Sequence, residues 1–126
     1  YVGVAAFGTA LDYINSIGID SIAAHEHELL TTATEKMMQI DGMRIFGNSA
    51  GKSAVISFLV GNINSYDLGV LLDKMGVAVR TGHHCAQPLM AHLGVQGTVR
   101  ASFAVYNTLA EVDRFIESLK RAVAMF

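Results

Sequence analysis

The sequence offers little from which a disulfide framework or a nucleic-acid surface could be built. Its 126 residues contain a single cysteine, Cys85, which excludes an internal disulfide and is consistent with a reducing compartment. The nine Lys and Arg residues and the eleven Asp and Glu residues are scattered and give a net charge of −2. Because no basic cluster is available to neutralise a row of phosphates, we expect no nucleic-acid partner.

Long hydrophobic runs are also lacking. No apolar stretch approaches the 18 or so residues of a membrane span, and the start of the chain lacks the basic region of a signal peptide. We therefore expect a cytoplasmic protein with no membrane partner. The chain begins with Tyr1 rather than Met, which leads us to expect a processed or excised piece.

What the sequence does contain indicates one folded domain over residues 1–126. Apolar residues make up 52% and charged residues 16%, which excludes a disordered chain. Apolar residues at helical spacing predict helices at residues 3–16, 21–40, 65–75 and 108–123. Asp20 or Ser21 is expected to cap the second helix, Gly76 to end the third, and Thr108 with Glu111 to form a capping box for the last.

Short apolar segments, the middle ones rich in β-branched residues, predict four strands at residues 43–46, 54–60, 77–80 and 98–103. Residues 47–52 form a short connection between the first two, which indicates a hairpin and hence partly antiparallel pairing. The expected fold class is α+β, with a small, mostly antiparallel sheet of about four strands and helices packed on one face.

The only thiol lies in a segment that also carries a cation and two imidazoles, Arg80-Thr81-Gly82-His83-His84-Cys85-Ala86-Gln87-Pro88. A cysteine reacts as its thiolate, which a nearby positive charge stabilises, and Arg80, His83 and His84 are placed to supply that charge. Gly82 allows a sharp turn, and Pro88 is expected to limit how far a helix or strand continues.

Two alternatives compete with a nucleophilic Cys85. A metal site built from His83, His84 and Cys85 is disfavoured, because zinc ligands are normally separated by two or more residues and the remaining histidines offer no matching pair. We therefore expect no metal. A simple buried turn with surface imidazoles stays open at this point, since a lone cysteine often packs as a small hydrophobic residue.

Two other motifs resemble functional sites but do not match them. Residues 47–53, Gly-Asn-Ser-Ala-Gly-Lys-Ser, have three residues between the glycines where a phosphate-binding loop has four, and an apolar strand follows where such a loop opens a helix. They predict a hairpin turn. His25-Glu26-His27-Glu28 predicts a solvated helix face, since residues two apart on a helix point in different directions.

Arg100 lies inside a predicted strand, between Val99 and Ala101. An unpaired buried cation is costly, so Arg100 either pairs with a structural carboxylate or binds an anionic ligand.

The thiol segment and the run Val99-Arg100-Ala101-Ser102-Phe103-Ala104-Val105-Tyr106-Asn107-Thr108 together resemble the group II, selenocysteine-lyase-like cysteine desulfurases. These are fold-type I enzymes of the aminotransferase class V family. The spacing from Cys85 to Arg100 belongs to the same match, and the opening segment through His25-Glu26 is similar to the start of the family's small domain. The resemblance covers nearly the whole chain and implies that residues 1–126 are the C-terminal small domain, without the large cofactor-binding domain.

The resemblance also implies an activity. These enzymes use pyridoxal 5′-phosphate to remove sulfur or selenium from L-cysteine or L-selenocysteine and release L-alanine. It implies that Cys85 is the nucleophile that becomes a persulfide, that Arg100 holds the substrate carboxylate, and that Arg80, His83 and His84 support the loop. A sulfur-acceptor protein, a homodimer and a role in iron–sulfur cluster assembly are implied as well.

The cofactor's Schiff-base lysine follows a histidine in the family's large domain, and no His-Lys pair occurs here. The four lysines are Lys36, Lys52, Lys74 and Lys120. We therefore expect no cofactor-binding residue in this chain, pyridoxal phosphate only in the full-length enzyme, and no activity from the chain alone. The alternative is a stand-alone persulfide relay or interaction domain without cofactor chemistry.

Overall fold

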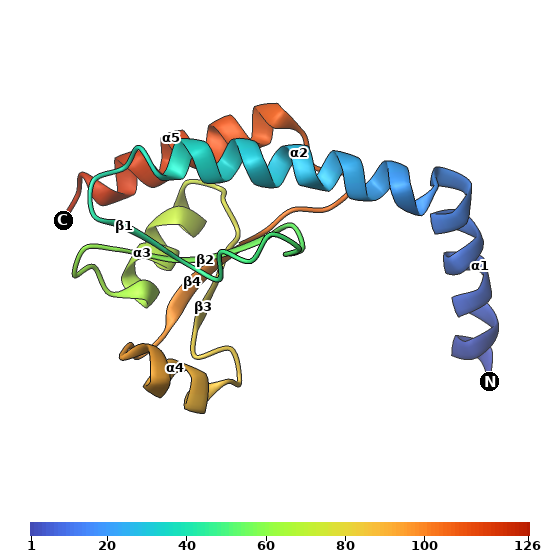
Figure 1. The fold of residues 1–126 in the computed structure, drawn as a ribbon, viewed down its shortest axis with the longest axis horizontal. Coiled ribbons are helices and arrows are strands. Elements are labelled where there is room, and N and C mark those ends of the chain that lie inside the picture. Colours follow the sequence, from blue (N-terminus) through green and yellow to red (C-terminus); the bar gives the residue numbers. More distant parts are fainter.

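The computed structural model describes all of residues 1–126 and contains five helices and one four-stranded sheet (Figure 1). The helices are α1 (Val2–Ile17), α2 (Ile19–Met37), α3 (Ser65–Lys74), α4 (Gln87–Leu93) and α5 (Leu109–Val123). The strands are β1 (Met43–Phe46), β2 (Val55–Val60), β3 (Arg80–Gly82) and β4 (Thr98–Ser102). Their order in the sheet is β1-β2-β4-β3, and every neighbouring pair is antiparallel. The α+β prediction is confirmed.

Strand alternation gives the sheet two different faces. Ile56 pairs with Ala101 and Phe58 with Val99, and all four are buried against the helices. The alternate positions point the other way. Four of them stand in cross-strand register and define what we call the open face: Phe46, Ser57, Arg100 and Arg80.

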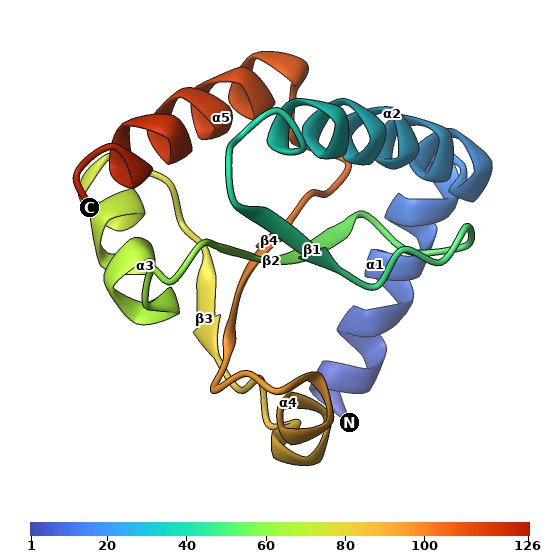
Figure 2. The same cartoon turned by 60° about the vertical axis from the view of Figure 1, so that its left-hand side comes forward.

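The core lies between the apolar face of the sheet and helices α2, α3 and α5 (Figure 2). Phe115 of α5 packs edge-on against Phe58, with ring centroids 6.2 Å apart. Helix α2 contributes Leu29, Leu30, Ala33 and Met37 to the same cluster. Fully burying one such large apolar side chain contributes about 1.5–3 kcal/mol to stability. This face of the sheet is covered by apolar side chains and serves the fold.

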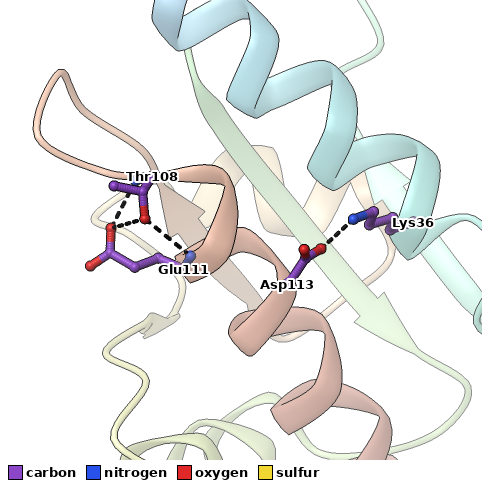
Figure 3. A network of polar contacts seen from close by, with 4 residues as sticks. All are labelled: Lys36, Thr108, Glu111 and Asp113. Carbon is purple, nitrogen blue, oxygen red and sulfur yellow. Dashed lines mark hydrogen bonds and ion pairs between the residues drawn. The ribbon is translucent and has the colours of Figure 1, made fainter.

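The N-terminus of α5 has the predicted capping box (Figure 3). The Glu111 N–H donates to Thr108 Oγ1 at 3.3 Å, and the Thr108 N–H donates to the Glu111 carboxylate at 2.8 Å. The bond from the Thr108 N–H, followed by one from the Thr108 hydroxyl to the same carboxylate, lowers the pKa of Glu111. An exposed ion pair between Lys36 and Asp113 links α2 to α5 and adds little stability by itself.

Helix α3 ends as predicted at a glycine. Gly76 has φ +79°, and the Val77 N–H donates to Leu72 O at 2.9 Å, which satisfies a carbonyl at the helix end. The strand predicted at residues 77–80 is wrong, because β3 begins only at Arg80. Val77 completes the helix end and, with Val79, packs against the core, so these β-branched residues are used for packing rather than pairing.

Two expectations for the first half of the chain fail. Helix α2 begins at Ile19, directly after Gly18, and has no side-chain cap, so neither Asp20 nor Ser21 caps it. It ends at Met37 rather than at residue 40, and Ile40 reaches the core from the following turn.

Helix α1 has no buried residue and stands apart from the sheet (Figure 1). Leu11 and Ile14, which share its apolar stripe, are both exposed. No single helix is long and apolar enough to cross a bilayer; α1 and α2 meet that test only together, as a pair bent by 72°.

Helix α4 was not predicted. Pro88 lies in its first turn, where the missing N–H has no partner to lose, so the expectation that Pro88 would limit a helix is wrong. The helix lies on the side of the sheet away from α2 and α5 (Figure 2). The β1–β2 connection is a loop between antiparallel strands, as predicted, and Lys52 Nζ donates to Gly47 O within it at 3.2 Å.

Candidate active site

Cys85 lies in a tight turn between β3 and α4, which we call the thiol turn (residues 83–86). The Ala86 N–H donates to His83 O at 2.9 Å and closes it. His84 and Cys85, the two central residues, have φ +55° and +58°. Positive φ at both positions is typical of a type I′ turn, which normally uses Asn and Gly. Each left-handed L-residue costs about 1–2 kcal/mol, so other contacts must hold the turn in place.

Two imidazoles provide such contacts. His83 Nδ1 accepts a hydrogen bond from the Cys85 N–H at 3.0 Å. His84 Nε2 lies 2.9 Å from Thr98 Oγ1 and 3.2 Å from Thr98 O on β4. A carbonyl oxygen only accepts, so Nε2 of His84 carries the proton and Nδ1 has a free lone pair. Each ring is therefore held within the protein through one of its two nitrogens.

A close approach of two glycines brings the thiol turn to β4. A Cβ atom on Gly97 would lie 2.7 Å from the carbonyl carbon of Gly82, closer than real contacts allow. Gly82 itself has φ +109°, a value that L-residues rarely adopt. Glycine at both positions lets β3 and β4 meet tightly where the thiol turn begins.

Next to the thiol turn, the open face forms a cavity of about 530 Å³. It is lined by Phe46, Gly47, Ser57, His84, Ala86, Leu89, Met90, Leu93, Thr98 and Arg100. Two buried polar atoms belonging to its lining residues have no hydrogen-bond partner, His84 Nδ1 and Arg100 Nε. Another hollow, of about 270 Å³ between residues 76–79 and α5, has no such atom, so we place the candidate site at the thiol turn.

Arg100 makes no ion pair within this chain, whose one salt bridge joins Lys36 to Asp113. It stands directly across from Arg80 in the β3–β4 register and from Ser57 in the β2–β4 register, so its cross-strand neighbours are a second cation and a hydroxyl. The alternative of a structural carboxylate is therefore not supported by these residues. A buried, unpartnered guanidinium N–H fits an anion, and a carboxylate matches its planar, two-pronged geometry.

The charge around the cavity is positive. Burial lowers the pKa of His84 below 6.5, the charges of Arg100, Arg80 and His83 lower it further, and only the hydrogen bond to Thr98 opposes them. The lowered pKa favours the neutral form of His84, in which Nδ1 is an unpaired hydrogen-bond acceptor. The site thus combines the exposed thiol of Cys85, the guanidinium of Arg100 and the unpaired Nδ1 of His84.

The structure brings together most of the residues singled out in the sequence. His84 and Arg100 both line the cavity, and Arg80 stands across from Arg100. Cys85 is exposed and does not line the cavity itself, although its neighbours His84 and Ala86 do, and His83 is exposed beside it. The apolar lining from α4 was missed, because that helix was not predicted. Thr98 was missed too, although its place two residues before Arg100 puts it on the same strand face.

The solvated-face prediction for residues 25–28 is wrong for His25. Its Nε2 lies 2.8 Å from Asn107 O, and the ring is partly buried. Asn107 Oδ1 in turn accepts from the Ala104 N–H at 2.9 Å, so the segment before α5 is held against α2. Helical spacing within α2 carries no signal of a partner more than eighty residues away.

Comparison with known proteins gives consistent matches. The family model for aminotransferase class-V matches residues 1–115. A probable cysteine desulfurase of Xylella fastidiosa is 50% identical over 119 residues, which are 94% of this chain and 28% of that protein. A cysteine desulfurase of Salmonella agona is 46% identical over 94% of this chain and 29% of its own length.

Solved structures give the same result. The crystal structure of the Escherichia coli cysteine desulfurase CsdA matches with a TM-score of 0.86 at 35% identity, over 93% of this chain and 29% of that one. The apo cysteine desulfurase of Thermococcus onnurineus also has a TM-score of 0.86, at 38% identity over 91% of this chain and 29% of its own. The chain therefore spans less than a third of the length of these proteins.

Proposed function

Because the chain belongs to the aminotransferase class-V family, we propose that residues 1–126 are the C-terminal small domain of a cysteine desulfurase that converts L-cysteine to L-alanine. The cysteine desulfurases that match nearly the whole chain support this proposal. One structural observation carries it: Arg100 Nε is buried without a partner in the cavity beside the thiol turn.

In this proposal, Arg100 binds the carboxylate of the substrate and orients the amino acid toward the thiol turn. Cys85 Sγ then forms a bond to the substrate sulfur while the Cβ–S bond of the substrate breaks. The sulfur stays on Cys85 as a persulfide. The three-carbon fragment keeps the electron pair of the broken bond, takes up a proton and leaves as L-alanine.

The lysines of this chain do not fit the Schiff-base role of the family's cofactor. No lysine lines the cavity, and Lys36 is already paired with Asp113. Pyridoxal phosphate supplies an electron sink where it is bound, and residues outside this chain must hold it. What this chain contributes is the thiol, the carboxylate-binding guanidinium and the positive surroundings of both.

The test uses the full-length protein, incubated with L-cysteine, with alanine measured by amino-acid analysis and Cys85 by mass spectrometry. Without a thiol reductant we expect an added mass of one sulfur atom on the Cys85 peptide. With dithiothreitol, which reduces the persulfide and releases the sulfur as sulfide, we expect alanine at a steady rate. Cys85→Ser should release essentially no alanine, and Arg121→Ala, on the far helix α5, should behave like wild type. Alanine release by Cys85→Ser at the wild-type rate would refute the assignment.

The exposed position of Cys85 also suits delivery of sulfur to an acceptor protein, which we propose as its partner. The same exposure supports the alternative of a stand-alone relay. A persulfide donor added to the 126-residue chain should place sulfur on Cys85 under the relay alternative, and Cys85→Ser is the control. Activity on selenocysteine, a role in iron–sulfur cluster assembly, a homodimer and a cytoplasmic location remain predictions from the resemblance.

A further inference from the structure

We propose that His83 is a positioning residue for the Cys85 thiol, acting through the hydrogen bond that its Nδ1 accepts from the Cys85 N–H. The kinetic part of this inference rests on the proposed function. The structural part does not, because it concerns how the thiol turn is held.

The two halves of the thiol turn are held differently. His84 is fixed to β4 through Thr98, which is itself fully buried. Cys85 has an exposed side chain with no hydrogen bond of its own, and its backbone N–H is bound only by His83. His83 therefore holds the backbone of Cys85 in place, and the backbone sets the direction in which the Cys85 side chain points.

The His83 contact to the Cys85 N–H resembles the hydrogen bond of an Asx turn. In an Asx turn, the side-chain oxygen of Asn or Asp accepts a hydrogen bond from the N–H two residues later. His83 Nδ1 makes the same two-residue contact to Cys85, at 3.0 Å. The bond favours a turn in which both His84 and Cys85 have positive φ, a conformation that neither residue type prefers.

The contact also defines the state of the His83 ring. Because the Cys85 N–H donates, Nδ1 must be unprotonated, and a neutral His83 carries its proton on Nε2. A side chain that keeps an acceptor at this position but cannot exchange a proton should preserve the turn. Asn meets that description, and Leu has similar bulk without an acceptor.

The first readout is steady-state kinetics of the full-length enzyme with L-cysteine. We expect His83→Leu to lower kcat about threefold to tenfold with little change in KM, since a neutral hydrogen bond contributes about 0.5–1.5 kcal/mol and 1.4 kcal/mol is tenfold. His83→Asn should stay within about twofold of wild type. His92→Leu, at an exposed histidine of α4, is the matched control and should not change kcat.

The second readout is amide hydrogen exchange of Cys85 in ¹⁵N-cysteine-labelled protein, assigned with Cys85→Ser. Exchange should be about threefold to tenfold faster in His83→Leu and near the wild-type rate in His83→Asn. Wild-type kcat and exchange in His83→Leu would overturn the inference, and so would a loss of kcat in His83→Asn as large as in His83→Leu, since the imidazole proton would then be needed. A wild-type protein that makes no alanine would refute the proposed function instead, and the exchange comparison would still decide on His83.

Discussion

Replacing Arg100 with Ala gives the sharpest test of how the cavity is used. The guanidinium has a buried Nε without a partner, faces no carboxylate of this chain and lines a cavity large enough for an amino acid. If its purpose is to bind the carboxylate of the substrate, the variant should fold normally and bind cysteine poorly. If its purpose is structural, folding should suffer first.

The expected loss follows from the type of bond. A hydrogen bond to a charged group contributes about 1.5–3 kcal/mol, and each 1.4 kcal/mol is a factor of ten, so the affinity for cysteine should fall about tenfold to 150-fold. Arg100→Ala also removes the repulsion from Arg80 across the strand pair, which should favour folding but not cysteine binding, because that repulsion is present in both the free and the bound protein. Arg100→Lys should recover only part of the affinity, since an ammonium keeps the charge without the planar fork.

The assay is a titration of the full-length protein with L-cysteine, followed by the absorbance of its bound cofactor. Arg121→Ala, a surface cation in the last turn of α5, is the control and should titrate like wild type. Thermal unfolding shows whether each variant is folded. Normal cysteine affinity in a folded Arg100→Ala variant would refute the carboxylate-binding role.

Other perturbations test the remaining parts of the site and the fold. Cys85→Ser should leave the cysteine-induced absorbance change intact while alanine release is lost, because binding does not need the thiol. The His84 ring should titrate below pH 6.5 by NMR, and Arg100→Ala should raise its pKa by removing a nearby charge. Because the His84 pKa is lower in the folded wild-type protein than in the unfolded chain, the unfolded chain takes up the His84 proton more readily. Stability should therefore fall as the pH drops below about 6.5, and His84→Gln should flatten that fall in thermal unfolding. Thr108→Ala should cost about 1 kcal/mol at the start of α5, seen as about fivefold faster amide exchange in its first turns. Gly97→Ala should destabilise the protein by about 1–3 kcal/mol, because the new Cβ meets the Gly82 backbone.

The fold was predictable where local chemistry decides it. The capping box at Thr108 and Glu111 fixes the start of α5, and Gly76 fixes the end of α3, because both signals depend on residues within one turn. The start of α2 was not predictable in this way, since Gly18 has no side chain to form a cap, whereas Asp20 and Ser21 do. The position of β3 depends on pairing with β4, a contact that no local pattern contains.

The residues of the candidate site could be singled out from the sequence, but their geometry could not. Cys85 and Arg100 were identified from their surroundings in the sequence and from the family resemblance. The left-handed turn was not, because His84-Cys85 lacks the Asn or Gly that normally indicates it. The His84 contact to Thr98 helps to hold this conformation and exists only once β3 and β4 have paired. The local hydrogen bond from the Cys85 N–H to His83 Nδ1 adds to it.

The geometry also couples Arg100 to His84. The charge of Arg100 is one cause of the lowered His84 pKa, so a carboxylate bound to Arg100 would offset that charge and raise the pKa. By linkage, the carboxylate must then bind more tightly when His84 is protonated. The pKa of His84 should therefore respond to occupation of the cavity, and His84 belongs to the same turn that carries Cys85, with its ring bound to Thr98 of β4. Arg100 and the Cys85 thiol are linked in this way through His84, because the charge of Arg100 acts on the His84 imidazole and the His84 backbone adjoins that of Cys85.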